Sequence, residues 1–223
     1  MKDRTEQILQ AAVQGFIECG EPISSGWLYR HYDFGIKPAM IRFELEELVD
    51  LGFLEQPHHS AGRVPSDRGY GFFVEQMLQK ETKENTDRAL KNLFEERSWE
   101  DLAEKLSSKM KLLSVVADMN HGLLHKAGID SLLERFLSDD PQEMLNIVRD
   151  FVELDERIED AESHLGERDI EVFFGKNSPV SRSENLAVVA GSYRVDGGKV
   201  YLFAIGPKRM DYKKIVNSFR CLQ

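Results

Sequence analysis

The first eighty residues are divided by glycine and proline into short runs, which limits the folds open to them. Apolar side chains recur at helical spacing within three of these runs, and a turn-rich segment follows. The sequence predicts helices at about 2–19, 25–32, 38–51 and 66–80, with a short strand at 53–56 and a loop at 57–63. Because this order of elements is typical of a winged helix-turn-helix, we predict that fold over residues 1–80.

The rest of the chain predicts a small domain of mixed helices and strands, so the fold class is α+β. Residues 81–111 are highly charged and are interpreted as a helical linker, and 112–223 as the second domain. Asp196-Gly197-Gly198 predicts a tight hairpin turn. The expected elements are strands at 112–117, 171–174, 186–194 and 199–205 and helices at 129–136, 141–165 and 210–219.

The net charge of the chain bears on whether it can bind nucleic acid. The formal charge is −10, which taken alone argues against DNA. Residues 26–43, however, carry three basic side chains and one acidic one. Residues 57–71 carry two basic side chains and one acidic one. Residues 44–55 hold five acidic side chains and no basic one. A weakly basic face beside an acidic one is compatible with DNA and predicts modest non-specific affinity.

The cysteine content and the hydropathy of the sequence indicate the cellular compartment in which the protein functions. Cys19 and Cys221 lie far apart, which suggests a reducing compartment rather than a disulfide framework. No run of apolar residues approaches the length needed to span a bilayer, and the N-terminus has no apolar signal region. We therefore expect a cytoplasmic protein with no membrane partner.

The third predicted helix offers a face that could read DNA. Lys37, Met40 and Phe43 step by three along one side of it, offset from the apolar stripe that begins at Ile41. Met40 and Phe43 could contact thymine methyl groups, and Arg42 could bind a guanine or a phosphate. The N-terminal residues of a recognition helix are the ones that meet base edges.

The predicted loop and the second helix supply further candidate contacts. Arg63 could enter the minor groove or bind a phosphate, with His59 and Ser60 as hydrogen-bond donors. Ser24 and Ser25 stand at a helix N-terminus, which favours phosphate but also suits ordinary capping. The full set of candidate DNA contacts is Ser24, Ser25, Lys37, Ala39, Met40, Arg42, Phe43, His59, Ser60, Arg63 and Arg68.

Four stretches resemble one known family. Gly52–Ser66 closely resembles the wing of the heat-inducible transcription repressor family (HrcA), and 21–25 and 38–42 look like its helix-turn-helix. Gly206-Pro207-Lys208-Arg209-Met210-Asp211-Tyr212 is similar to its C-terminal signature. The resemblance implies a homodimeric repressor of chaperone genes on an inverted-repeat operator. It also implies a sensor-like, GAF-like second domain and a GroEL-type chaperonin that supports the active form.

The chain also departs from the family pattern. Family members are usually longer, and the sensor domain is reduced here between about Asp118 and Gly128. Met40 and Phe43 stand where the family tends to have threonine and asparagine, so apolar side chains replace polar base readers. The resemblance therefore leaves the operator sequence open, while it still implies repression.

Other functions find weaker support in the sequence. His121 and His125 are four apart, but Gly122 replaces the glutamate of a metalloprotease helix, so we expect no metal. Gly175-Lys176-Asn177-Ser178 lacks the first glycine of a phosphate loop. No catalytic set or cofactor motif is evident, and we expect no enzyme. Two alternatives stay open: a winged helix used only to bind protein, with Phe43 buried at the interface, and a regulator that responds to a small molecule.

Overall fold

The computed structural model describes residues 1–80, 87–135, 141–161, 165 and 168–223. The chain divides into two compact units, Met1–Lys80 and Glu81–Gln223. Helices and antiparallel sheets occur in both units, so the α+β class expected from the sequence is confirmed. None of the helices within these described residues is long and apolar enough to cross a membrane.

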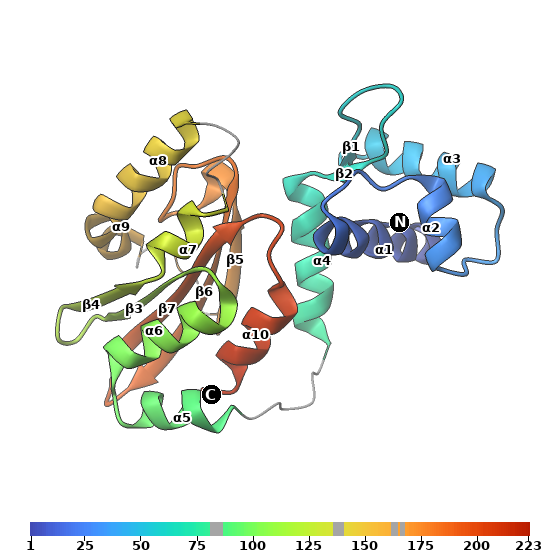
Figure 1. The fold of residues 1–223 in the computed structure, drawn as a ribbon. Helices are drawn as coiled ribbons and strands as arrows, with labels where there is room; N and C mark the ends of the chain where they lie inside the picture. The colour runs from blue at the N-terminus through green and yellow to red at the C-terminus, as the bar shows by residue number, and fades with distance from the viewer. Residues whose placement is uncertain (81–86, 136–140, 162–164, 166–167) are drawn as a thin grey trace. The chain divides into compact units, whose positions relative to one another are not determined.

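The first unit contains the expected order of elements (Figure 1). Its helices and strands are α1 (Asp3–Cys19), α2 (Ser25–His31), α3 (Pro38–Asp50), β1 (Leu54–Glu55), β2 (Val64–Pro65) and α4 (Asp67–Gln79). Gly20 ends α1 with a φ of 74°, a conformation that glycine adopts without strain. Helix α1 packs against α2, α3 and α4, and its buried side chains include Ile8, Leu9 and Val13.

Two glycines allow close backbone contacts around the β1–β2 hairpin. The strands pair antiparallel, and the loop between them, residues 56–63, returns to a bridge between Ile23 and Arg63. A Cβ on Gly62 would lie 2.5 Å from the Pro22 carbonyl oxygen. A Cβ on Gly69 would lie 2.1 Å from the carbonyl oxygen of Phe53. A side chain at either glycine would force the hairpin away from its neighbours.

The second unit is built on one antiparallel sheet (Figure 1). Its strands are β3 (Leu113–Asp118), β4 (Leu123–Ala127), β5 (Ile170–Phe174), β6 (Leu186–Val195) and β7 (Gly198–Pro207), in the order β4-β3-β7-β6-β5. Its helices are α5 (Arg88–Glu95), α6 (Trp99–Met110), α7 (Ile129–Leu133), α8 (Pro141–Val152), α9 (Leu154–Ala161) and α10 (Tyr212–Arg220), with a 3-10 turn, η1, at Gly175–Asn177. The predicted hairpin turn joins β6 to β7, with Asp196 and Gly197 both at positive φ.

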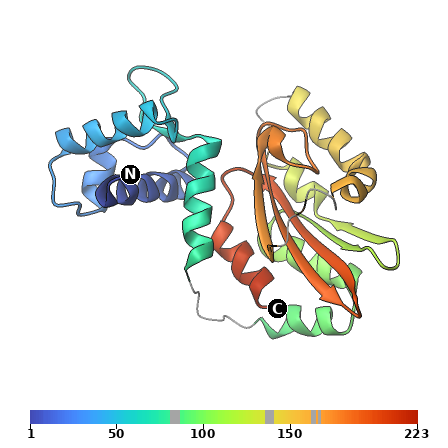
Figure 2. The same ribbon diagram turned by 180° about the vertical axis from the view of Figure 1, so that it is seen from behind.

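Helices cover both faces of this sheet. Figure 1 views it from the side of α6 and α10, and Figure 2 from the opposite side. Val115 of β3, Val188 of β6 and Phe203 of β7 share one buried cluster with side chains of α7, α8 and α9. On the other face, α6 contacts β3 and β4, and α10 contacts β6. The three inner strands, β3, β7 and β6, are therefore buried on both sides, as in a three-layer domain.

The structure differs from the sequence-based expectation at three places. Residues 88–110 are helical but are no linker, because Leu102 and Leu106 of α6 are buried against the sheet. Strand β4 was not predicted, and the single helix expected at 141–165 is broken into α8 and α9. The expectations for 81–86, Phe136 and 162–164 fall outside the described residues.

The 206–212 segment forms the corner between β7 and α10. The side chain of Asp211 caps the helix by accepting a hydrogen bond from the Lys214 backbone N–H at 2.9 Å. Met210 is buried, and the Tyr212 hydroxyl donates to the carbonyl of Lys208. The segment that resembles the family signature thus has a structural role within the second unit.

Candidate nucleic-acid interface

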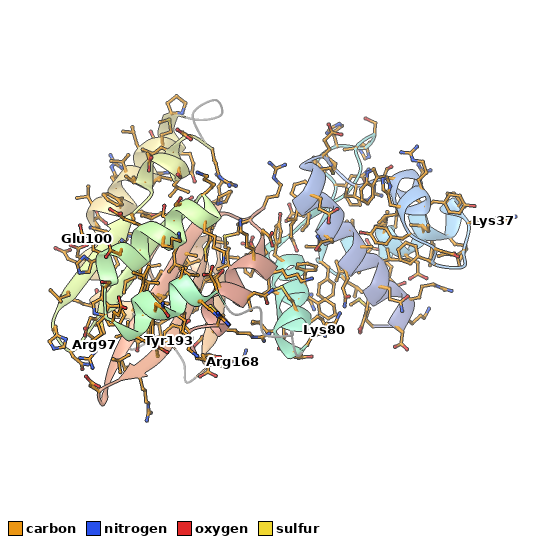
Figure 3. All side chains as sticks on the ribbon, turned by 60° about the horizontal axis from the view of Figure 1, so that its bottom comes forward. Lys37, Lys80, Arg97, Glu100, Arg168 and Tyr193 are labelled. Atoms are coloured by element: carbon orange, nitrogen blue, oxygen red, sulfur yellow. The ribbon has the colours of Figure 1, made fainter. Side chains whose placement is uncertain are left out.

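Helix α3 buries one side and exposes the other. Ile41, Leu45 and Leu48 are at most 2% exposed, whereas Met40 is 46% and Phe43 60% exposed. Pro38 begins the helix at the position where proline fits, and Lys37 is the residue before it. Lys37, Ala39 and Arg42 are also exposed, and Lys37 extends outward from the first unit (Figure 3). Lys37 and the four candidates within α3 are thus exposed to solvent, which the helical spacing predicts for Lys37, Met40 and Phe43.

A buried carboxylate fixes α3 against α1. Oε2 of Glu44 accepts a hydrogen bond from the Thr5 hydroxyl at 2.6 Å, and Oε1 accepts one from Nη2 of Arg4 at 3.1 Å. The hydrogen bond from Thr5 and the adjacent Arg4 guanidinium lower the pKa of Glu44 despite its burial. From the sequence, Glu44 is only one of the five acidic side chains of residues 44–55, because its partners lie some forty residues earlier in the chain. One of the five acidic charges beside the α3 face is therefore paired inside the fold.

Ser24 is engaged as a helix cap. Its Oγ accepts a hydrogen bond from the Trp27 backbone N–H at 3.0 Å, while the residue stays exposed. Ser25 is the first residue of α2 and is half-buried. Because the Ser24 side chain already satisfies one N-terminal N–H, its capping role is shown by this geometry.

The loop between β1 and β2 exposes two candidates and turns a third inward. His59 and Ser60 are exposed at its tip, where the Ala61 N–H donates to the His58 carbonyl at 2.8 Å. Arg63 is half-buried, and its Nη1 donates to the Ala61 carbonyl at 3.2 Å. The Nε of Arg63 is buried without a hydrogen-bond partner. Part of this guanidinium therefore faces the loop's own backbone.

Arg68 supports the C-terminal end of α3. Its Nη1 donates to the Leu51 carbonyl at 2.7 Å, and its guanidinium lies 4.3 Å from the centroid of the Phe53 ring. A cation that binds the last carbonyls of a helix stabilises that end of the helix. Arg68 is exposed, so it combines a structural contact with access to solvent.

The histidines considered for a metal site lie on the β3–β4 hairpin. Nδ1 of His121 lies 2.9 Å from Oδ2 of Asp118, which also accepts a hydrogen bond from Nε1 of Trp99 at 3.0 Å. Burial raises the pKa of Asp118, but the hydrogen bonds from His121 and Trp99 outweigh it and leave the pKa lowered. His125 pairs with Val116 across the hairpin. The described part of the chain holds no group of three or more His, Cys, Asp or Glu placed to bind a metal ion.

Two hollows of the second unit bear on whether it could hold a small molecule. A cavity of about 10 Å³ lies between the sheet and α8 and α9, lined by residues that include Leu113, Ile147 and Leu154. That is about the room for one water, far below the roughly 300–1,000 Å³ of a small-molecule pocket. A hollow of about 790 Å³ near Phe94 and Tyr193 is open and carries charged side chains. It therefore lacks the enclosed, mostly apolar form usual for such pockets.

A buried carboxylate in the second unit, Asp150, also has a structural role that the sequence did not predict. Oδ2 of Asp150 on α8 accepts hydrogen bonds from the Ser181 hydroxyl at 2.6 Å and the Arg182 N–H at 2.9 Å. Its Oδ1 pairs with Nη1 of Arg157 at 2.6 Å. On the same loop, the Ser183 hydroxyl donates to Glu143. These polar groups hold α8 and α9 to the loop that precedes β6.

Comparison with known proteins relates the chain to one family. The family model described as "HrcA protein C terminal domain" matches residues 70–216. The "Heat-inducible transcription repressor HrcA" of Clostridium perfringens (strain SM101 / Type A) is 46% identical over 88 residues, which are 40% of this chain and 26% of that protein. The protein of the same name from Desulfitobacterium hafniense (strain DSM 10664 / DCB-2) is 39% identical over 117 residues, 51% of this chain and 33% of that one. The chain thus spans about a quarter to a third of the length of these relatives.

One solved structure shares the fold. The "Crystal structure of a hypothetical protein at 2.2 A resolution" superposes with a TM-score of 0.80 at 20% identity. The match covers 100% of this chain and 96% of that one. At this identity the likeness concerns the fold alone.

Proposed function

Because this chain belongs to the HrcA family, we propose that it is a DNA-binding transcriptional repressor of heat-shock genes. The observation that carries the proposal is the solvent-facing side of α3, where Lys37, Met40 and Phe43 are exposed over a buried anchor. An exposed large aromatic side chain on a firmly held helix is typical of a surface that meets a partner.

Residues 1–80 would act as a winged helix-turn-helix, with α3 in the major groove. Met40 and Phe43 would contact thymine methyl groups, and Arg42 a guanine or a phosphate. The β1–β2 loop would be the wing, with His59, Ser60 and Arg63 near the minor groove or the backbone. Ser24, Ser25, Ala39 and Arg68 complete the proposed interface, with Ser24 and Arg68 also serving the fold.

The second unit would pair two subunits. A single winged helix forms a small interface, and two linked half-sites multiply the affinity, so we propose a homodimer on an inverted repeat. The antiparallel sheet with helices on both faces supports a reduced GAF-like architecture for this unit. A DNA partner implies a cytoplasmic protein. Sedimentation that shows a monomer at micromolar concentration, alone and on DNA, would contradict the dimer.

Heat would act on the fold of the second unit rather than through a ligand. The cavity between the sheet and α8 and α9 is too small for a ligand, which favours this choice at that position. The family resemblance adds a GroEL-type chaperonin that restores the active form. The test is DNA binding recovered after a brief heat pulse, with and without chaperonin and ATP. We expect greater recovery of DNA binding when chaperonin and ATP are present. Equal recovery with and without them would contradict a role for the chaperonin.

Selection of bound duplexes from a random pool tests the proposal as a whole. We expect an inverted repeat whose half-sites are about one or two helical turns apart. Recovery of a motif without symmetry would support DNA binding but contradict the proposed homodimer. Failure to enrich any sequence would instead favour the alternative, in which Phe43 is buried against another protein.

A further inference from the structure

The side-chain amide of Gln56 spans the base of the β1–β2 loop. Its Nε2 donates to the carbonyl of His59 at 3.0 Å and to the carbonyl of Ala61 at 3.2 Å. These two carbonyls flank Ser60 at the exposed tip. We infer that Gln56 is a positioning residue that holds the loop in its DNA-binding shape before DNA arrives, an inference that rests on the proposed function.

The loop is braced from both strands. Gln56 follows β1 and reaches the Ala61 carbonyl from one side, and Nη1 of Arg63 reaches the same oxygen from the β2 side at 3.2 Å. The base is closed by two backbone hydrogen bonds of 2.8 Å between Ile23 and Arg63. Gln56 therefore connects this fixed base to the tip of the loop, where the exposed candidates His59 and Ser60 lie.

The hydrogen-bond capacity of Gln56 indicates that it acts through the loop. A glutamine amide nitrogen has two N–H donors, and here both point to backbone carbonyls. The remaining amide oxygen only accepts hydrogen bonds, so a phosphate oxygen gains nothing from it. Gln56 thus affects DNA through the placement of His59 and Ser60.

A preformed loop binds more tightly because less conformational freedom is lost on association. Without the brace, the tip would be ordered only when DNA binds, and that entropy cost would subtract from the affinity. The effect should therefore appear in DNA binding and in local loop dynamics, with little change in global stability.

The test uses Gln56→Met in the full chain, which keeps side-chain length and removes both donors. The control is Gln79→Met, an exposed glutamine at the end of α4. We expect affinity for the selected duplex to fall about tenfold, the equivalent of one or two lost hydrogen bonds. Hydrogen exchange at the Ala61 N–H should quicken without DNA, and the melting temperature should stay unchanged. The control should change none of the three.

A second background separates positioning from direct contact. In a His59→Ala, Ser60→Ala chain, Gln56→Met should cause no further loss of affinity, because the contacts that it places are gone. An additive loss there, or unchanged exchange at Ala61 in the single variant, would overturn the inference. If the wild-type chain enriches no duplex, the proposed function fails, and the exchange measurement still decides whether Gln56 braces the tip.

Discussion

The two units expose large apolar side chains in different places: the first on α3, and the second on α8, where Leu145, Val148 and Val152 are 41–71% exposed. Met40 and Phe43 are exposed on α3, above buried residues that hold the helix in place. Helices cover both faces of the sheet of the second unit. Under the proposed function, DNA contact would belong to the surface of the first unit, and subunit pairing and the response to heat to the second.

Each unit contains a buried carboxylate that joins segments distant in sequence. Glu44 ties α3 to α1, and Asp150 ties α8 to the loop before β6. Breaking them one at a time should separate the roles of the two units.

Asp150→Ala should give the largest effect, because it removes the acceptor of the Ser181 hydroxyl and the Arg182 N–H and leaves Arg157 with Glu153 as its remaining ion-pair partner. Removing one partner of a buried ion pair costs about 3–5 kcal/mol. We expect the second unit to unfold at lower denaturant, followed by fluorescence of Trp99, which lies in that unit. Glu159→Ala, at an exposed acid of α9, is the control. A loss as small as the control's would contradict the role given to Asp150.

Glu44→Ala should destabilise the first unit by about 2–3 kcal/mol, since it leaves the buried Thr5 hydroxyl without its charged partner. Trp27 reports on this unit. The exposed Glu46 supplies the matched variant, Glu46→Ala, which should cost at most about 0.5 kcal/mol. Similar losses in the two variants would show that Glu44 does not anchor α3.

The pH dependence of the wild type checks the same anchor. The folded-state pKa of Glu44 is lowered, so the unfolded chain binds its proton more readily. Its contribution to stability is therefore complete above the ordinary carboxyl pKa of about 4 and is lost as the pH falls through the lowered value. Glu44→Gln should flatten this part of the acid unfolding curve of the first unit. A curve with an unchanged slope would contradict the assignment.

Phe43→Asn should change which duplex is preferred and leave folding nearly intact. An amide that binds adenine through two hydrogen bonds gives about 1–3 kcal/mol of discrimination. Because Phe43 is 60% exposed, little packing is lost. The measurement is a repeated duplex selection together with a melting curve. An unfolded first unit would show that Phe43 belongs to the core.

Lys37→Ala should have the smallest effect and should act on all sequences alike. If Lys37 neutralises one phosphate, the slope of log affinity against log salt should fall by about 0.9. The exposed Lys2 at the N-terminus allows a charge-matched control, Lys2→Ala. Equal slopes in wild type and Lys37→Ala would remove Lys37 from the interface.

Local patterns predicted much of the first unit and the hairpins. The four helices of residues 1–80 begin and end within a few residues of their expected positions, because glycine, proline and serine mark their ends. The hairpin turn at Asp196 and Gly197 was also predicted correctly from the sequence. Strand β4 was not, because Leu123–Ala127 is short and lacks alternation.

The features that the sequence could not predict depend on distant partners. Glu44 looks like a surface acid until Thr5 is placed beside it, and Asp150 until the Ser181 loop folds over α8. The break between α5 and α6, with Arg97 at positive φ, is likewise absent from the helical pattern. At the candidate interface, exposure of α3 was predictable, but the inward turn of Arg63 and the brace by Gln56 were not.

Sequence-specific binding is the central claim, and a comparison of two duplexes measures it directly. The wild-type chain is titrated with its selected inverted repeat and with a scrambled duplex of equal length and composition, at physiological salt. We predict affinity for the selected duplex at least about 10³-fold higher than for the scrambled one. Equal affinities for the two duplexes would contradict the account.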